Sequence, residues 1–332
     1  MKIKNIVAVT CVVGVILGLG VSPVRAESLR EALVQAYQNN PTLLAERARL
    51  RSTDEEISQA VSGWRPTVSI TSDAGYQNRS RTTTGSSKTS DSTLPRGATL
   101  SIDQTLYNGG KVAAATRRAE NLVQSDRARL LRTEQSILLG AVTAYVGVVQ
   151  DQAVLELNIN NENVLQRQLE ATRDRFNVGE VTRTDVAQAE SRLSRATAER
   201  VRAEGDLVNS RATYQNVVGT APGKLSPAKP LKDLTANVVE TTNLARERSF
   251  GVVEADFIER AARDQVNRIA AELKPTLNLS GDISRDYENV NSKSETDTFA
   301  ITATFSVPLY QSGDVSSRIR AAKQVVAQRR NE

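Results

Sequence analysis

The most constraining feature of this sequence is one very long helical stretch. From Val112 to Phe176 there is no proline, and apolar residues recur every three or four positions, as they do on one face of an α-helix. At a rise of about 1.5 Å per residue, such a helix would be on the order of 100 Å long. A compact globular domain has no use for a helix of that length, so the sequence predicts an extended helical structure.

A second helix follows directly and makes the stretch a helical hairpin over residues 111–218. Gly179 suits a helix C-cap, where a left-handed residue is needed, and Thr182 followed by Asp185 has the spacing of a capping box. From Val186 to Val217, apolar and small residues alternate three and four apart, which is typical of a coiled-coil seam. The tip of this hairpin is expected at Val178, Gly179, Glu180, Val181 and Thr182.

The N-terminus has the pattern of a secretory signal peptide. A basic start, an uncharged apolar run from Ile6 to Val21 and a small-residue cleavage site predict removal of residues 1–26, with the cut after Ala26. A retained membrane anchor is the alternative, but the apolar run is short for it. The only cysteine, Cys11, would leave with the signal, so the exported chain would hold neither cysteine nor histidine.

Charge and composition argue against an enzyme and against nucleic-acid binding. The formal net charge is +5, and three uncompensated positive charges belong to the signal, which leaves +2 on the mature chain. Without histidine, mature cysteine, a phosphate loop or clustered carboxylates, the usual acid–base, nucleophilic and metal sites cannot be built. We expect no catalytic residue, no metal and no cofactor.

Strand patterns occur at two separate places in the chain. A first β-hairpin is expected over residues 66–106 around a polar loop at 77–96, and a second over 275–309 around a loop at 286–297. In each hairpin, apolar residues alternate with threonine and serine, so one face is apolar and the other polar. Helices precede both hairpins, one from Ser28 that Pro41 bends or divides, and one over 243–273.

Two motifs recur along the chain in the same order. Residues 64–70 match residues 273–279, and residues 105–112 match residues 308–315. The repetition predicts an internal duplication, with a first repeat at 27–219, a connector at 220–242 and a second repeat at 243–332. Chance similarity of two short motifs is the alternative. If the repeat is faithful, about 90 residues of a second helical hairpin are missing, and we expect a truncated chain that does not conduct.

Four strands with one apolar face indicate a shared membrane barrel. They cannot close a barrel alone, and an open strand edge cannot sit in lipid, so several copies must contribute strands. A soluble sandwich with one wet face is the alternative. Aromatic residues fall near the strand ends, as membrane-interface girdles require: Trp64, Tyr107 and Tyr310 on one side, and Tyr76, Tyr287 and Phe299 on the other. Glycines mark the strand-to-helix junctions at Gly109, Gly110 and Gly313.

On these residues the sequence resembles the TolC family of outer-membrane efflux and secretion channels. The duplication, the proline-led strands at Pro66 and Pro275, the junction at residues 106–110 and the tip at residues 175–186 carry the resemblance, which covers residues 28–332. It implies an α+β membrane protein of the outer membrane and periplasm. In such a protein, three copies contribute four strands each to one twelve-stranded barrel.

The resemblance also implies partners and roles for single residues. The helical cylinder would meet a periplasmic adaptor and, through it, an inner-membrane RND pump or ABC exporter that moves drugs, small toxic compounds or polypeptides. The tip residues 178–182 would dock the adaptor, and a tight helix turn without a partner is the less favoured alternative. Thr184 and Asp185 match the first-hairpin side of the periplasmic gate, although helix capping explains them as well.

Two other classes of protein share parts of this pattern. A trimeric adhesin joins a coiled-coil stalk to a shared barrel, but its strands would lie together at the C-terminus. A periplasmic adaptor carries a long helical hairpin, but it would lack two membrane-type strand hairpins. Both remain alternatives to the channel at this point.

Overall fold

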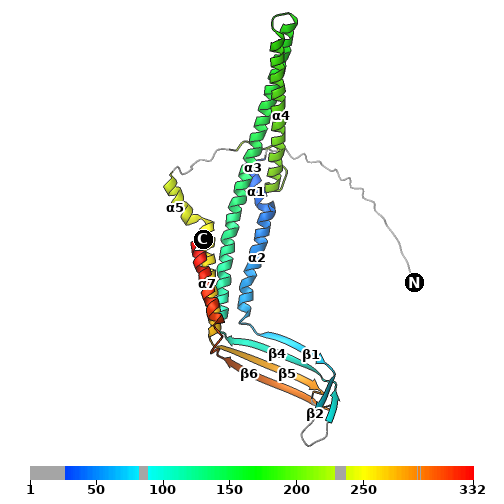
Figure 1. The fold of residues 1–332 in the computed structure, drawn as a ribbon, viewed down its shortest axis with the longest axis vertical. Coiled ribbons are helices and arrows are strands. Elements are labelled where there is room, and N and C mark those ends of the chain that lie inside the picture. Colours follow the sequence, from blue (N-terminus) through cyan, green and yellow to red (C-terminus); the bar gives the residue numbers. More distant parts are fainter. Residues whose placement is uncertain (1–26, 82–88, 229–236, 290, 292) are drawn as a thin grey trace, which may run out of the picture. The chain divides into compact units, whose positions relative to one another are not determined.

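The computed structural model describes residues 27–81, 89–228, 237–289, 291 and 293–332, and the predicted signal peptide, 1–26, lies outside them. Long helices and a strand sheet dominate these residues (Figure 1). In chain order the elements are α1 (Leu29–Asn39), α2 (Pro41–Ser62), β1 (Thr67–Ala74), β2 (Gln77–Arg81), β3 (Thr89–Thr93), β4 (Arg96–Tyr107), α3 (Lys111–Asn177), α4 (Arg183–Val218), α5 (Val238–Arg248), α6 (Phe250–Ala270), the 3₁₀ turn η1 (Ala271–Leu273), β5 (Thr276–Tyr287), β6 (Glu295–Ser306) and α7 (Asp314–Asn331).

The chain divides into two compact units. The hairpin unit takes its described residues from 1–34, 142–216 and 220–229, and the sheet unit takes them from 35–141, 217–219 and 230–332. The hairpin unit holds most of α4 and the tip half of α3. The sheet unit holds all the strands, the first half of α3 and the helices α2, α5, α6 and α7.

Proline divides the N-terminal helix in the way the sequence predicts. Ser28 and Glu31 form the expected capping box at the start of α1, with the Ser28 N–H 2.8 Å and the Ser28 hydroxyl 2.9 Å from one Glu31 carboxylate oxygen. The chain then breaks at Asn40, whose side-chain oxygen accepts from the N–H groups of Thr42 and Leu43. Pro41 occupies the first turn of α2, where its missing N–H is harmless.

The long helical hairpin forms with the predicted bounds. On α4 the predicted seam is buried at Ala196, Ala203, Leu207 and Tyr214, each less than a tenth exposed. On α3 the seam holds at Ala141, Val148 and Leu169, whereas Ile159 and Phe176, expected on the same face, are exposed. By length and composition alone α3 could cross a membrane, and it is the one helix of the described residues that could. Only 22% of its apolar window is buried, and the completely buried Ala141 and Val148 show that α3 packs against the protein along one face there.

A buried hydrogen-bond cluster fastens one end of the hairpin unit. The hydroxyl of Tyr145 lies within hydrogen-bond distance of two backbone oxygens, those of Glu27, 2.9 Å away, and Ser226, 2.6 Å away. The hydroxyl of Tyr214 donates to the Glu27 carboxylate at 2.7 Å, and burial together with this carboxylate raises the pKa of Tyr214. Glu27 also forms a parallel β-bridge with Leu225. We call Glu27, Tyr145, Tyr214 and Ser226 the tyrosine clasp.

Two expectations about loops and helices were wrong. The polar stretch 77–96, expected to be a loop, contains the strand pair β2–β3 with Gln77 opposite Thr93. Both faces of this pair are polar, so it lacks the apolar alternation that identifies a strand. The helix expected at 243–273 begins at Val238, capped by Asn237, and is broken at Ser249, whose backbone is extended.

The two strand hairpins join in one antiparallel sheet of order β1-β4-β5-β6. Strands β5 and β6 reach further than expected, to Tyr287 and from Glu295, so the loop between them is shorter than the predicted 286–297. The pairing is regular except for a shift between Thr105 and Tyr107 in β4. This register decides which side chains share a face of the sheet.

Candidate functional site

One face of the four-stranded sheet is polar and carries acidic residues without basic ones. The register aligns Ser69, Ser101, Asp282 and Ala300 in one row and Asp73, Gly97, Asp286 and Thr296 in another. Because side chains alternate between faces, Asp103 lies on this face too. No lysine or arginine of the four strands lies there, and Asp282 accepts a hydrogen bond from the Ser101 hydroxyl at 2.7 Å. This face is suited to water.

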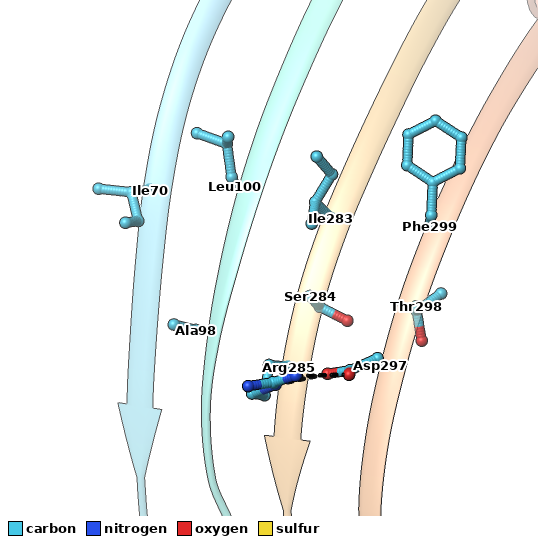
Figure 2. A pocket seen from close by; sticks show the side chains of 9 residues that line it. All are labelled: Ile70, Ala98, Leu100, Ile283, Ser284, Arg285, Asp297, Thr298 and Phe299. Carbon is cyan, nitrogen blue, oxygen red and sulfur yellow. Dashed lines mark hydrogen bonds and ion pairs between the residues drawn. The ribbon is translucent and has the colours of Figure 1, made fainter.

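The opposite face is apolar over most of its length. Figure 2 shows Ile70, Leu100, Ile283 and Phe299 in one row across β1, β4, β5 and β6. Ile70 is 76% exposed and Phe299 71%, so no part of the chain that the structure describes covers them. From Phe299 to Val307 the apolar positions extend about 27 Å along the chain, or about 21 Å along the membrane normal at a tilt of about 40°. The apolar band of outer-membrane barrels is about 25 Å tall.

Charged residues border this apolar face at the end where β5 turns into β6. Arg285 donates two hydrogen bonds of 2.6 Å to the carboxylate of Asp297, drawn as a dashed contact in Figure 2. Next to it Arg96 pairs with Glu288 at 3.0 Å and lies over the ring of Tyr287. Tyr287 therefore lies at the expected border. Phe299, expected at the same border, lies further in, opposite Ile283.

The sheet has two open edges. Strands β1 and β6 each pair on one side only, and the strands that the structure describes form no closed sheet. Free N–H and C=O groups along such edges must find partners before the sheet can enter lipid.

The hairpin tip has the geometry of a helix stop followed by a helix start. Gly179 has a φ of 81°, its N–H donates to the Phe176 oxygen, and the Glu180 N–H donates to the Arg175 oxygen at 2.9 Å, which is a Schellman motif. Val178 is 78% exposed, whereas Val181 is half-buried. Within residues 178–182, the tip thus presents one exposed apolar side chain on a hydrogen-bonded turn.

The two predicted gate residues differ in what they contact. Asp185 accepts from the Thr182 hydroxyl at 2.7 Å and from the Thr182 N–H at 2.8 Å, and these bonds lower the pKa of Asp185. The capping box predicted here is confirmed. Thr184 is exposed. The gate role of both residues stays a prediction.

The strand-to-helix junctions share one backbone conformation. Gly109 and Gly110 have φ of 67° and 88°, and Ser312 and Gly313, at the matching positions of the second motif, have 51° and 79°. Only glycine adopts such angles without strain, which explains why three of the four are glycine. Gly109 is also packed tightly, because an added Cβ would lie 2.6 Å from Lys274 Cβ and 2.7 Å from the Ala271 oxygen.

Glu272 connects the two junctions and was not anticipated. Its carboxylate lies 2.7 Å from Nη1 of Arg318 on α7 and 3.4 Å from Nζ of Lys111 on α3. Arg318 chiefly, and Lys111 beside it, lower the pKa of Glu272. Neither the acidic residues of the polar face nor the Arg285–Asp297 pair was predicted from the sequence. For the polar face, the alternation of Ser101 and Asp103, and of Asp282, Ser284 and Asp286, could have indicated it.

Comparisons with known proteins agree with this architecture. The family model described as outer membrane efflux protein matches residues 32–220 and 241–332. The outer membrane efflux protein BepC of Brucella suis biovar 1 (strain 1330) is 32% identical over 308 residues, which are 92% of this chain and 66% of BepC. The outer membrane protein TolC of Escherichia coli (strain K12) is 26% identical over 329 residues, 93% of this chain and 65% of that TolC. The chain thus spans about two thirds of the length of these relatives.

Solved structures show the same fold. The outer membrane protein VceC of Vibrio cholerae has a TM-score of 0.72 at 21% identity, and the match covers 91% of this chain and 74% of VceC. Since the family model covers most of the chain, the chain belongs to the outer membrane efflux protein family.

Proposed function

We propose that this chain is the outer-membrane channel component of a tripartite efflux pump or type I secretion system. The observation that carries the proposal is the sheet with one apolar face, one polar face and two open edges. Three copies would pool twelve strands, which closes the edges, turns the apolar faces to lipid and the polar faces to a water-filled lumen. The repeated junction conformation at Gly109–Gly110 and Ser312–Gly313 supports the internal duplication on which this barrel depends.

The helical hairpin would carry the conduit into the periplasm. At about 1.5 Å per residue, the 67 residues of α3 reach on the order of 100 Å. Tip residues 178–182 would dock a periplasmic adaptor, with the exposed Val178 as the apolar contact. Through the adaptor the channel would serve an RND pump or an ABC exporter, with drugs, small toxic compounds or polypeptides as cargo.

The gate role of Thr184 and Asp185 is the least direct part of the proposal. Asp185 would have to leave Thr182, or share its second oxygen, to bond another hairpin. The carboxylate of Asp185 is charged at neutral pH and can accept such a bond, and its bonds to Thr182 lower its pKa further.

A pair of cysteine variants tests the face assignment. Ala300 lies beside Asp282 on the polar face, and Ala303 lies on the apolar face of the same strand. We would introduce Ala300→Cys and Ala303→Cys separately, express each variant in an outer membrane and add a membrane-impermeant maleimide. Cys11, the only native cysteine, lies in the predicted signal and leaves the background clear.

The proposal expects labelling at position 300 and protection at position 303, in a detergent-extracted species of three chains. Equal labelling of both positions, or a well-folded monomer that stays in buffer without detergent, would overturn the channel assignment.

A further inference from the structure

The two repeats pack their helices beside the sheet in the same register. In the first repeat α2 packs on α3, and the Thr53 hydroxyl donates to the Asp126 carboxylate at 2.7 Å. In the second repeat α6 packs on α7, and Arg330 lies 3.4 Å from the Glu259 carboxylate. The matching motifs relate α2 to α6 by an offset of 209 residues and α3 to α7 by an offset of 203. Under these offsets the two contacts fall within one helical turn of each other.

The repeats meet where α3 lies beside α6. The carboxylate of Asp264 accepts hydrogen bonds there from Nε of Arg117 at 3.1 Å and from the side-chain amide of Asn121 at 2.9 Å. We call these three residues the α3–α6 triad. The helices of the sheet unit thus stand in the order α2, α3, α6 and α7, and Figure 1 shows α2 and α7 on opposite sides of α3.

The outer helices of this row leave bare the positions that the inner helices cover. Ala114 and Ala261 lie one helical turn before Arg117 and Asp264 on the same faces, and they are only 2% and 3% exposed. The equivalent positions on α7 and α2 are serines at 317 and 52, and both are exposed. Since the repeats otherwise pack alike, α3 and α6 are covered because they lie against each other, and α7 and α2 lack such a neighbour in the described part of the chain.

The duplication supplies a second set of the triad residues. By the same offsets the triad maps onto Arg320 and Gln324 of α7 and onto Glu55 of α2. Each side chain keeps its chemistry, which is a guanidinium, a carboxamide and a carboxylate. All three are exposed, and within the residues that the structure describes none of these side chains has a hydrogen-bond or ion-pair partner. Because α2 and α7 lie at opposite ends of the row, the three cannot meet within one chain.

We propose that Arg320 and Gln324 of one copy bind Glu55 of the next copy, so that α7 packs on α2 of its neighbour in the register of α3 on α6. This inference rests on the proposed function, which brings several copies together. The sheet agrees with it, because α2 leads into the edge strand β1 and α7 follows the edge strand β6. A neighbour that pairs its β1 with β6 therefore brings its α2 beside α7, and guanidinium and amide donors then face a carboxylate.

Cysteine cross-linking in membranes tests the contact. The mature chain holds no cysteine once the predicted signal has left, so the double variant Glu55→Cys with Arg320→Cys adds the thiols that react. With a short bis-maleimide it should give covalent dimers and trimers on denaturing gels. Arg49→Cys with Arg320→Cys is the matched control, because the exposed Arg49 lies about 9 Å from Glu55 along α2 and should cross-link at least fivefold less. Arg117→Cys with Asp264→Cys should cross-link within single chains.

Charge reversal tests the ion pair itself. Arg320→Glu places two carboxylates together, and the detergent-solubilised oligomer should dissociate at a roughly fivefold higher protein concentration than the wild type. Adding Glu55→Arg to this variant should restore assembly. Arg329→Glu makes the same change on the same helix at a residue that pairs with Glu332 three positions on, and it should assemble like the wild type.

The outcomes separate this inference from the proposed function. An oligomer that keeps the labelling difference between positions 300 and 303 but gives no 55–320 cross-link between chains would refute the contact and leave the channel proposal standing. A double reversal that does not restore assembly would refute the ion pair. A chain that stays monomeric in membranes and labels equally at both positions would overturn both.

Discussion

The tight packing of Gly109 yields a quantitative prediction about the first strand-to-helix junction. An alanine at position 109 would meet two obstacles. Its φ of 67° costs a residue with a Cβ about 1–2 kcal/mol. Its Cβ would also lie 2.6 Å from Lys274 Cβ and 2.7 Å from the Ala271 carbonyl oxygen, and neither atom is the movable end of a side chain. Such overpacking costs about 1–3 kcal/mol, so Gly109→Ala should lose about 2–5 kcal/mol of unfolding free energy.

The neighbouring glycine provides the control. Gly110 has a φ of 88°, but a Cβ there would meet nothing within 4 Å. Gly110→Ala should therefore lose only about 1–2 kcal/mol. Both substitutions stiffen the unfolded chain alike, so that contribution cancels in the comparison. Urea unfolding of the detergent-solubilised protein, followed by circular dichroism of the helices, measures both losses. Equal losses for the two variants would refute the contact between residue 109 and the turn at 271–274.

Three further predictions follow from single contacts. The pKa of Glu272 in the folded chain lies below its ordinary value of 4.5, so the stability that Glu272 contributes is present above pH 4.5 and is lost as the pH falls through the folded pKa. The difference in unfolding free energy between wild type and Glu272→Gln should therefore shrink in unfolding measurements at acid pH. A difference that grows would contradict the ion pairs. Val178→Asp should leave the circular dichroism spectrum unchanged and reduce cross-linking of the tip to the cognate adaptor, whereas undiminished cross-linking would remove Val178 from the docking surface. Tyr214→Phe removes the bond to Glu27. Because the pKa of Tyr214 is raised in the folded chain, the stability that its hydroxyl contributes is complete below pH 10.0 and is lost as the pH rises above that value. The wild type should therefore lose stability at high pH more steeply than the variant.

The helices and the main strands could be predicted from local patterns. The bounds of α3 follow from a proline-free period and a glycine stop, and the break at Asn40 follows from Pro41. Both patterns act within one or two helical turns, so the sequence displays them directly. The same holds for the alternation that gave the two faces of β6.

Features that depend on distant pairing could not be predicted in this way. The strands β2 and β3 are polar on both faces, so burial leaves no period in their sequence. The contact of Asp264 with Arg117 and Asn121 arises only when α6 is brought beside α3. Likewise, Glu272 gains its role from Lys111 and Arg318, which are far away along the chain.

The tyrosine clasp sets an order of events for folding. Glu27 bonds to Lys224 and Ser226, almost two hundred positions later, so these contacts close a very large loop. Closing a loop of that size without intervening structure carries a high entropic cost, which falls once the helical hairpin has brought residues 145 and 214 together. We therefore expect Glu27, although it is the first of the described residues, to gain these bonds only after the hairpin has formed.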